Sequence, residues 1–163
     1  MGDILNRMRE SLLAVLARLS GGGRVPDSGR HDHEVSDLTV ISMSCGHMDY
    51  SCSYSFALTL NEGKWFFDAE CFTHQFKTET AFSGREVKSA DIERLYDILE
   101  RNGSIAYAET YRKPEKQPFE VMDGTMYGFC LTFSDGSRYI ADSAGTARRE
   151  LEDFFYRLAE KTD

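Results

Sequence analysis

Aromatic and aliphatic residues alternate with small ones in two stretches of the chain, 50–60 and 127–133, which is the pattern of half-buried β-strands. Each stretch ends in an acidic residue followed by glycine, at Gly63 and at Gly136, and apolar residues then resume. This combination predicts two β-hairpins, and the Ser, Ala and Thr positions between the large side chains predict an exposed sheet face. We expect the other strands at 38–45, 64–72, 86–88, 105–111 and 139–141.

The two hairpins resemble each other in sequence. YSFALTLNEG and YGFCLTFSDG share five of ten positions, but a chain of this length offers thousands of window pairs, so on the order of one such match arises by chance. The spacing to the next helix also differs, with 29 residues from Gly63 to Ile92 and 15 from Gly136 to Leu151. We interpret the segments as two similar hairpins and not as an internal duplication.

Two later segments carry apolar residues at helical spacing. One helix is expected over 89–102 and the other from about 146 onward; their apolar stripes are Ile92, Leu95, Tyr96 and Leu99, and Leu151, Phe154, Phe155 and Leu158. The order is therefore hairpin, helix, strand, hairpin, helix. It predicts an α+β fold, with a mostly antiparallel sheet of about five to seven strands and two helices packed on one face.

The N-terminal region is expected to stand apart from this domain. Residues 1–19 predict an amphipathic helix with one apolar stripe, formed by Leu5, Met8, Leu12, Leu16 and Leu19. Residues 20–34, SGGGRVPDSGRHDHE, are rich in glycine and charge and predict a flexible linker, in which the HDHE segment is solvated. Residues 35–163 are expected to form a single α+β domain.

The apolar stripe of the N-terminal helix must be buried against another surface for the helix to be stable. We expect it to dock on its own domain or on a second copy, or to contact a protein partner. A membrane surface is disfavoured, because this helix has no Trp or Phe and only a thin cationic face.

Charge and cysteine content narrow the classes of function. The net charge is -8, and residues 1–34 hold five basic and five acidic residues, so 14 basic and 22 acidic residues remain for the domain. An acidic domain repels phosphate backbones, and we expect no nucleic-acid binding. The four cysteines are too few for a disulfide scaffold, and no export signal is recognised at 1–20. Reduced thiols in a cytoplasmic protein are therefore expected.

Two clusters have the side chains that an enzyme would need. Asp68, Glu70 and His74 would share one face of a strand, where oxygen and imidazole ligands could hold a divalent ion; the alternative is a solvated sheet face. Cys45, His47 and Cys52 could form a thiol and imidazole cluster across a bend; the alternative is buried structural cysteines.

A long polar loop over 113–124 is the best candidate for a binding edge, since loops of this length often have a role. Its apolar residues are Phe119, Val121 and Met122. The alternative is a mobile connection without a binding role. The sequence has no phosphate-binding glycine loop, nucleophile elbow or zinc-protease helix.

The segments SGREVKSADIERLYDILERNGSIAYAE, YGFCLTFSDGSRYIADSAG and LEDFFYRL resemble a loose group of small bacterial proteins of unassigned function. Members of this group alternate hairpins with two short helices, so the resemblance implies the same α+β fold. It implies no catalytic motif. The function expected from the sequence is a non-catalytic binding or protein-interaction domain without a cofactor, and the alternative is a small metal- or thiol-dependent enzyme with its site on the sheet.

Overall fold

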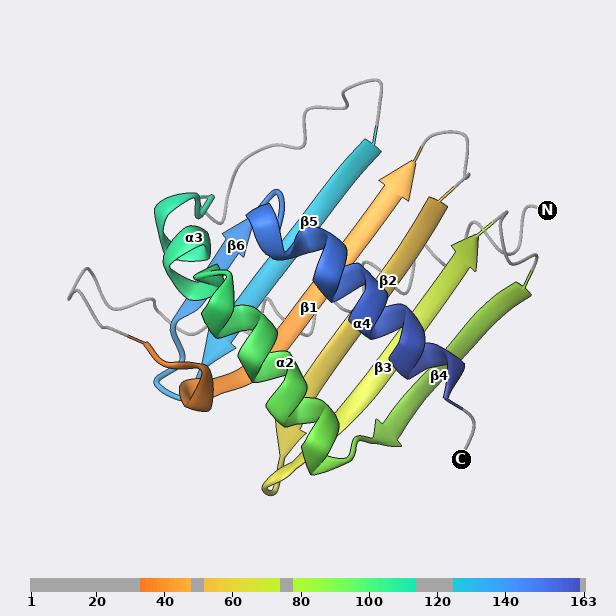
Figure 1. The fold of residues 1–163 in the computed structure, drawn as a ribbon, viewed down its shortest axis with the longest axis horizontal. Coiled ribbons are helices and arrows are strands. Elements are labelled where there is room, and N and C mark those ends of the chain that lie inside the picture. The colour runs from red at the N-terminus through yellow and green to blue at the C-terminus, as the bar shows by residue number, and fades with distance from the viewer. Residues whose placement is uncertain (1–32, 48–51, 74–77, 114–124, 162–163) are drawn as a thin grey trace.

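The computed structural model describes residues 33–47, 52–73, 78–113 and 125–161, which form one antiparallel sheet with helices on one side (Figure 1). In the described part the sheet has six strands: β1 (Leu38–His47), β2 (Cys52–Asn61), β3 (Lys64–Thr73), β4 (Thr78–Glu86), β5 (Thr125–Phe133) and β6 (Arg138–Ala141). Their order is β4-β3-β2-β1-β5-β6, and each neighbouring pair is antiparallel. The α+β prediction is confirmed.

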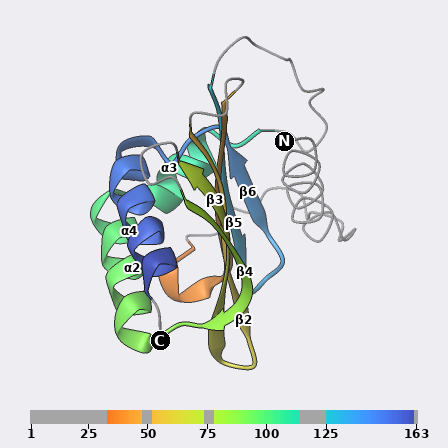
Figure 2. The same cartoon turned by 90° about the vertical axis from the view of Figure 1, so that its right-hand side faces the viewer.

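The α-helices of the described residues all lie on the same side of the sheet, as Figure 2 shows. They are α2 (Ser89–Arg101), α3 (Ser104–Thr110) and α4 (Arg148–Glu160), and the short 3-10 helices η1 (Val35–Asp37) and η2 (Gly145–Ala147) precede β1 and α4. Helices α2 and α4 lie side by side across the strands. The sequence predicted these two helices, and α3 is additional.

The apolar stripes of α2 and α4 pack against the sheet in a single core. Leu95 and Leu99 of α2, and Leu151 and Phe155 of α4, are each at most 1% exposed. On the sheet side, Phe56 of β2 is fully buried, and its ring stacks on that of Phe155 with 5.4 Å between centroids. The helical spacing in the sequence therefore identified the core-facing residues correctly.

Alternation along the strands divides the sheet into two faces. Ile41, Met43 and Cys45 of β1 belong to the core beneath the helices, so Ser42 between them faces the other side. The register places Ala57 of β2 on one side of Ser42 and Cys130 of β5 on the other. We call these three residues the central row, and the surface to which they belong the helix-free face, because none of the described helices lies on it.

The prediction of a strand over 105–111 is wrong, because Ser104–Thr110 forms α3. Ser104 and Ala108 are the buried residues of this helix, four positions apart and therefore on one side of it. Tyr107 and Tyr111 have the same spacing, and their ring centroids lie 4.6 Å apart. In this short segment a few apolar residues at alternate positions gave a misleading strand pattern.

The short strand predicted at 86–88 is also wrong in its bounds, because β4 covers Thr78–Glu86. A break in the β3–β4 register, between Phe67 and Ala69, disrupts the alternation. Asp68 holds this irregularity, since its Oδ1 accepts hydrogen bonds of 2.7 Å from both the Ser83 hydroxyl and the Gly84 amide. Gly84 has a φ of 73°, which only glycine adopts readily.

Candidate functional site

The central row is buried although the described helices lie on the opposite face. Ala57 and Cys130 are each 6% exposed and Ser42 is 9% exposed. Neither Ala57 nor Cys130 belongs to the hydrophobic core beneath the helices. The prediction that the small residues form a plain exposed surface is therefore wrong for the centre of this face.

Small side chains do not cover one another on an open sheet. Cross-strand Cβ atoms lie about 5 Å apart, and Ala, Ser and Cys are too short to reach over their neighbours. The burial reaches Ser53, four residues from Ala57 on the same face and 7% exposed, but it does not extend over the whole face. Thr59, two residues from Ala57 on the same face, is exposed, and Met126, four residues from Cys130, is 53% exposed. A buried centre with an exposed margin is the pattern of a contact surface.

Two further details suit close contact with another element. Gly128 lies next to Ser44 on this face, and a Cβ atom at Gly128 would be 2.7 Å from the Ser44 hydroxyl oxygen, so the surface is flat here. The hydroxyl oxygen of Thr132 is buried and has no hydrogen-bond partner in the described part of the chain. A buried hydroxyl without a partner costs free energy, which a contacting polar group would offset.

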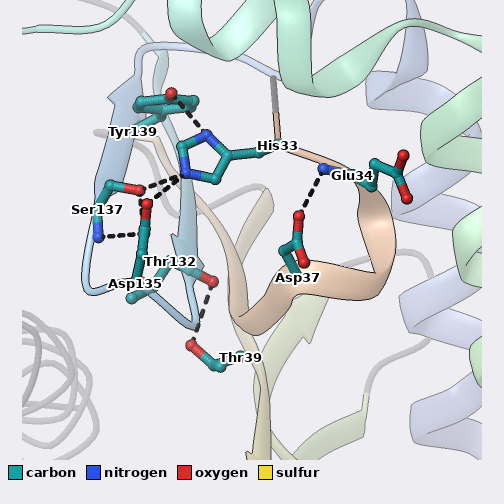
Figure 3. A network of polar contacts seen from close by, with 8 residues as sticks. All are labelled: His33, Glu34, Asp37, Thr39, Thr132, Asp135, Ser137 and Tyr139. Carbon is teal, nitrogen blue, oxygen red and sulfur yellow. Dashed lines mark hydrogen bonds and ion pairs between the residues drawn. The ribbon is translucent and has the colours of Figure 1, made fainter. Parts of the chain in front are cut away.

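A polar cluster around His33 joins the start of the described chain to the β5–β6 hairpin (Figure 3). The Nε2 atom of His33 lies 2.9 Å from Oδ2 of Asp135 and 2.8 Å from the Ser137 hydroxyl. Its Nδ1 atom lies 2.9 Å from the Tyr139 hydroxyl, and the ring stacks on Phe133 with 4.0 Å between centroids. With its side chain 6% exposed, His33 is anchored and not solvated as the sequence suggested.

Histidine, aspartate and serine together raise the question of a catalytic triad. In a triad the hydroxyl and the carboxylate bind opposite nitrogens of the imidazole ring. Here both approach Nε2, and a tyrosine hydroxyl lies at Nδ1. Hydrogen bonds from Ser137 and the contact with His33 hold the pKa of Asp135 well below its usual range. This geometry is suited to fixing His33 against the β5–β6 hairpin, and it does not fit nucleophilic catalysis.

A second polar contact lies between the sheet and α4. The hydroxyl of Tyr54 on β2 donates a 2.7 Å hydrogen bond to Oε1 of Glu152. Burial is the main reason that the pKa of Tyr54 rises above its ordinary value, and the contact with Glu152 adds to it. The guanidinium of Arg148, on the same helix, lies over the Tyr127 ring at 4.5 Å. These contacts attach α4 to β2 and β5 at one end of the sheet.

A shallow groove of about 260 Å³ runs between α2 and α4. Its polar lining consists of Arg94, Asp97, Arg101, Glu150, Asp153 and Arg157. Arg101 forms an ion pair across it with Glu150 of α4, at 2.6 Å, and a second one along α2 with Asp97, at 3.4 Å. Equal numbers of basic and acidic residues leave the groove without a preference for one sign of charge.

The proposed metal ligands are only partly assembled. Asp68 and Glu70 do face the same, helix-free side, because Phe67, Ala69 and Cys71 of β3 belong to the core. The Asp68 carboxylate is engaged by Ser83 and Gly84, and His74 lies outside the described residues. Among the described residues no group of three or more His, Cys, Asp and Glu side chains could hold a metal ion.

The cysteines fit the structural interpretation where their side chains are described. Cys71 and Cys130 are buried free thiols, Cys45 is buried as well, and burial raises the pKa of Cys71. Cys45 lies in the core, while the side chains of His47 and Cys52 are outside the described part. Other predicted contact residues also lie outside it: Leu5, Met8, Leu12, Leu16 and Leu19 of the N-terminal segment, and Phe119, Val121 and Met122 of the loop.

Comparison with protein-family models, with curated proteins and with solved structures finds no match to this chain. None of the helices in the described ranges is long and apolar enough to cross a membrane.

Proposed function

We propose that the protein is a protein-interaction domain that binds an apolar helix on the helix-free face of its sheet. The observation that carries this proposal is the burial of the central row, Ala57, Ser42 and Cys130, on the side away from α2, α3 and α4. Small residues let a helix approach the strands closely, and half-buried Val40 and Ile140 add apolar area beside the row.

A charge placed at Ala57 tests the proposal. The cross-strand neighbours of Ala57 are Ser42 and Asp68, so on an open face Ala57→Arg would gain an oppositely charged neighbour and be neutral or slightly stabilising. On a covered face the same arginine displaces the contacting element. The loss of stability is then limited to the free energy of that contact, which we expect to be about 2 kcal/mol.

Thr59→Arg is the matched control, because Thr59 is exposed on the same strand and the same face. We expect this control to change the free energy of unfolding by less than about 0.5 kcal/mol. Urea denaturation of both full-length variants beside the wild type measures the difference. Equal stabilities of the two variants would reject the helix-free face as a contact surface.

We also propose a cytoplasmic location, motivated by the free thiols at Cys71 and Cys130. Subcellular fractionation tests it, and recovery of the protein outside the cytoplasm would reject it.

A further inference from the structure

We infer that the helix bound to the helix-free face is the N-terminal segment of the same chain, residues 4–19. This inference rests on the proposed function, since it names the occupant of that surface. Four observations support this occupant over a second copy or an unrelated partner: single-chain burial, reach, dimensions and charge.

The central row is buried within a single chain. The exposures of Ala57, Ser42 and Cys130, all below 10%, are those of one protomer without any neighbour. The described helices lie on the other side of the sheet, as Figure 2 shows, and cannot supply this cover. An occupant from the same chain is therefore favoured over one from a second copy.

The tether is long enough for residues 4–19 to reach the surface. His33 is fixed beside the β5–β6 hairpin, and β6 is an edge strand of the sheet. Thirteen residues, 20–32, separate His33 from Leu19. A flexible linker of this length has a root-mean-square span of about 20 Å and a maximum near 43 Å. The centre of the sheet lies two or three strand spacings, roughly 10–15 Å, from β6.

The dimensions of the two elements agree. A helix over the 16 residues 4–19 is about 24 Å long, and six strands span about 24 Å across the sheet. The stripe of Leu5, Met8, Leu12, Leu16 and Leu19 can thus cross the sheet along its full width. An isolated helix of this length is only marginally stable in water, so contact with the sheet would stabilise both partners.

The charges are complementary as well. The segment carries Arg7, Arg9 and Arg18 against the single acid Glu10, whereas the remaining chain from residue 35 onward is acidic. Two of these acids, Asp68 and Glu70, lie on the helix-free face itself, on β3 beside Ala57 and Ser55. Arg9 borders the apolar stripe and can therefore approach the acidic margin while the leucines cover the central row.

Because the helix is tethered to the sheet, even a weak contact keeps it bound in most molecules. An effective concentration of about 1 mM gives roughly 99% occupancy for a contact whose dissociation constant is about 10 µM. We therefore expect the helix to be docked in most chains, so that any other helix must displace it.

The reactivity of Cys130 tests the occupant, because this thiol lies in the central row. In the full-length wild type we expect slow alkylation of Cys130 by N-ethylmaleimide, located by mass spectrometry of peptides. In the double variant Leu12→Asp/Leu16→Asp we expect alkylation to be at least about tenfold faster, because charges on the stripe oppose docking. Cys45 and Cys71, on the helix-covered side, should stay slow in both proteins.

Ala14→Asp/Ala17→Asp is the matched control, since it adds the same two charges on the opposite side of the helix. We expect Cys130 to react in this control at the wild-type rate. The wild-type rate should also be constant over a roughly hundredfold range of protein concentration, as an intramolecular contact requires.

The outcomes separate the inference from the proposed function. If protection of Cys130 is lost on dilution, the occupant is a second copy, and the inference fails while the proposed function stands. If the stripe variant reacts no faster than its control, residues 4–19 are not the occupant. In that case the stability of Ala57→Arg decides the rest. If Ala57→Arg is destabilising, the helix-free face is still a contact surface, and another segment occupies it. If Ala57→Arg is neutral, both proposals are rejected.

Discussion

Replacing Phe56 with alanine is expected to lower the free energy of unfolding by about 3–5 kcal/mol, the largest effect of any single change considered. Phe56 is fully buried, and its ring contacts four other aromatic rings, those of Tyr54, Phe67, Phe155 and Tyr156. Truncation would remove these contacts and leave a cavity between β2 and α4, because close-packed surroundings collapse only partly. Chemical denaturation measures the loss.

Tyr111→Ala is the control for Phe56→Ala, because Tyr111 is also aromatic but 61% exposed. Its loss should cost less than about 1 kcal/mol. A Phe56→Ala protein as stable as the Tyr111→Ala protein would contradict the position of β2 beneath α4.

Gly145→Ala is expected to destabilise the protein by roughly 3 kcal/mol, for two separable reasons. Gly145 begins η2 with a φ of 60°, a backbone conformation that side chains with a Cβ atom disfavour. A Cβ atom would also lie 2.7 Å from the ring of Tyr107, so the ring would have to move. That ring packs on Tyr111, and its displacement would disturb the contact between α3 and η2.

Gly103→Ala separates the two causes. Gly103 has a φ of 59°, nearly that of Gly145, but a Cβ atom there would meet nothing within 4 Å. We expect a cost of about 1 kcal/mol from the backbone conformation alone. Thermal or urea unfolding of both variants gives the difference, and equal losses would show that the Tyr107 ring does not confine this position.

Local patterns in the sequence predicted most of the fold because they report on local structure. Alternation identified both hairpins, and Gly63 and Gly136 have the positive φ angles expected at their turns, 78° and 84°. Helical spacing identified α2 and α4 with their buried residues. The α3 segment was misassigned because its seven residues contain too few turns to show a clear period.

Contacts between residues distant in sequence could not be predicted in this way. His33 lies 104 residues from Ser137 and 106 from Tyr139, and neither segment contains a signal that points to the other. Asp135 and Gly136 predicted a turn, and the histidine that binds next to this turn comes from a segment with the composition of a linker.

The central row illustrates the same limit for the candidate site. When each strand is considered alone, Ser42 and Ala57 are small residues typical of an exposed sheet face, and Cys130 holds the corresponding alternate position in β5. Only the strand order places them side by side, and only the solvent exposure shows that they are covered. The small residues were visible in the sequence, but the surface that they form depends on β1 lying between β2 and β5.

The central claim is that residues 4–19 bind the helix-free face, and amide hydrogen exchange of these residues in the full-length protein tests it most directly. We expect exchange slowed by about tenfold or more relative to an unfolded peptide, both in the wild type and in Thr59→Arg. In Ala57→Arg the same amides should exchange at the unfolded rate, because the charge displaces the helix. Unfolded rates in all three proteins, or protection that persists in Ala57→Arg, would contradict the claim.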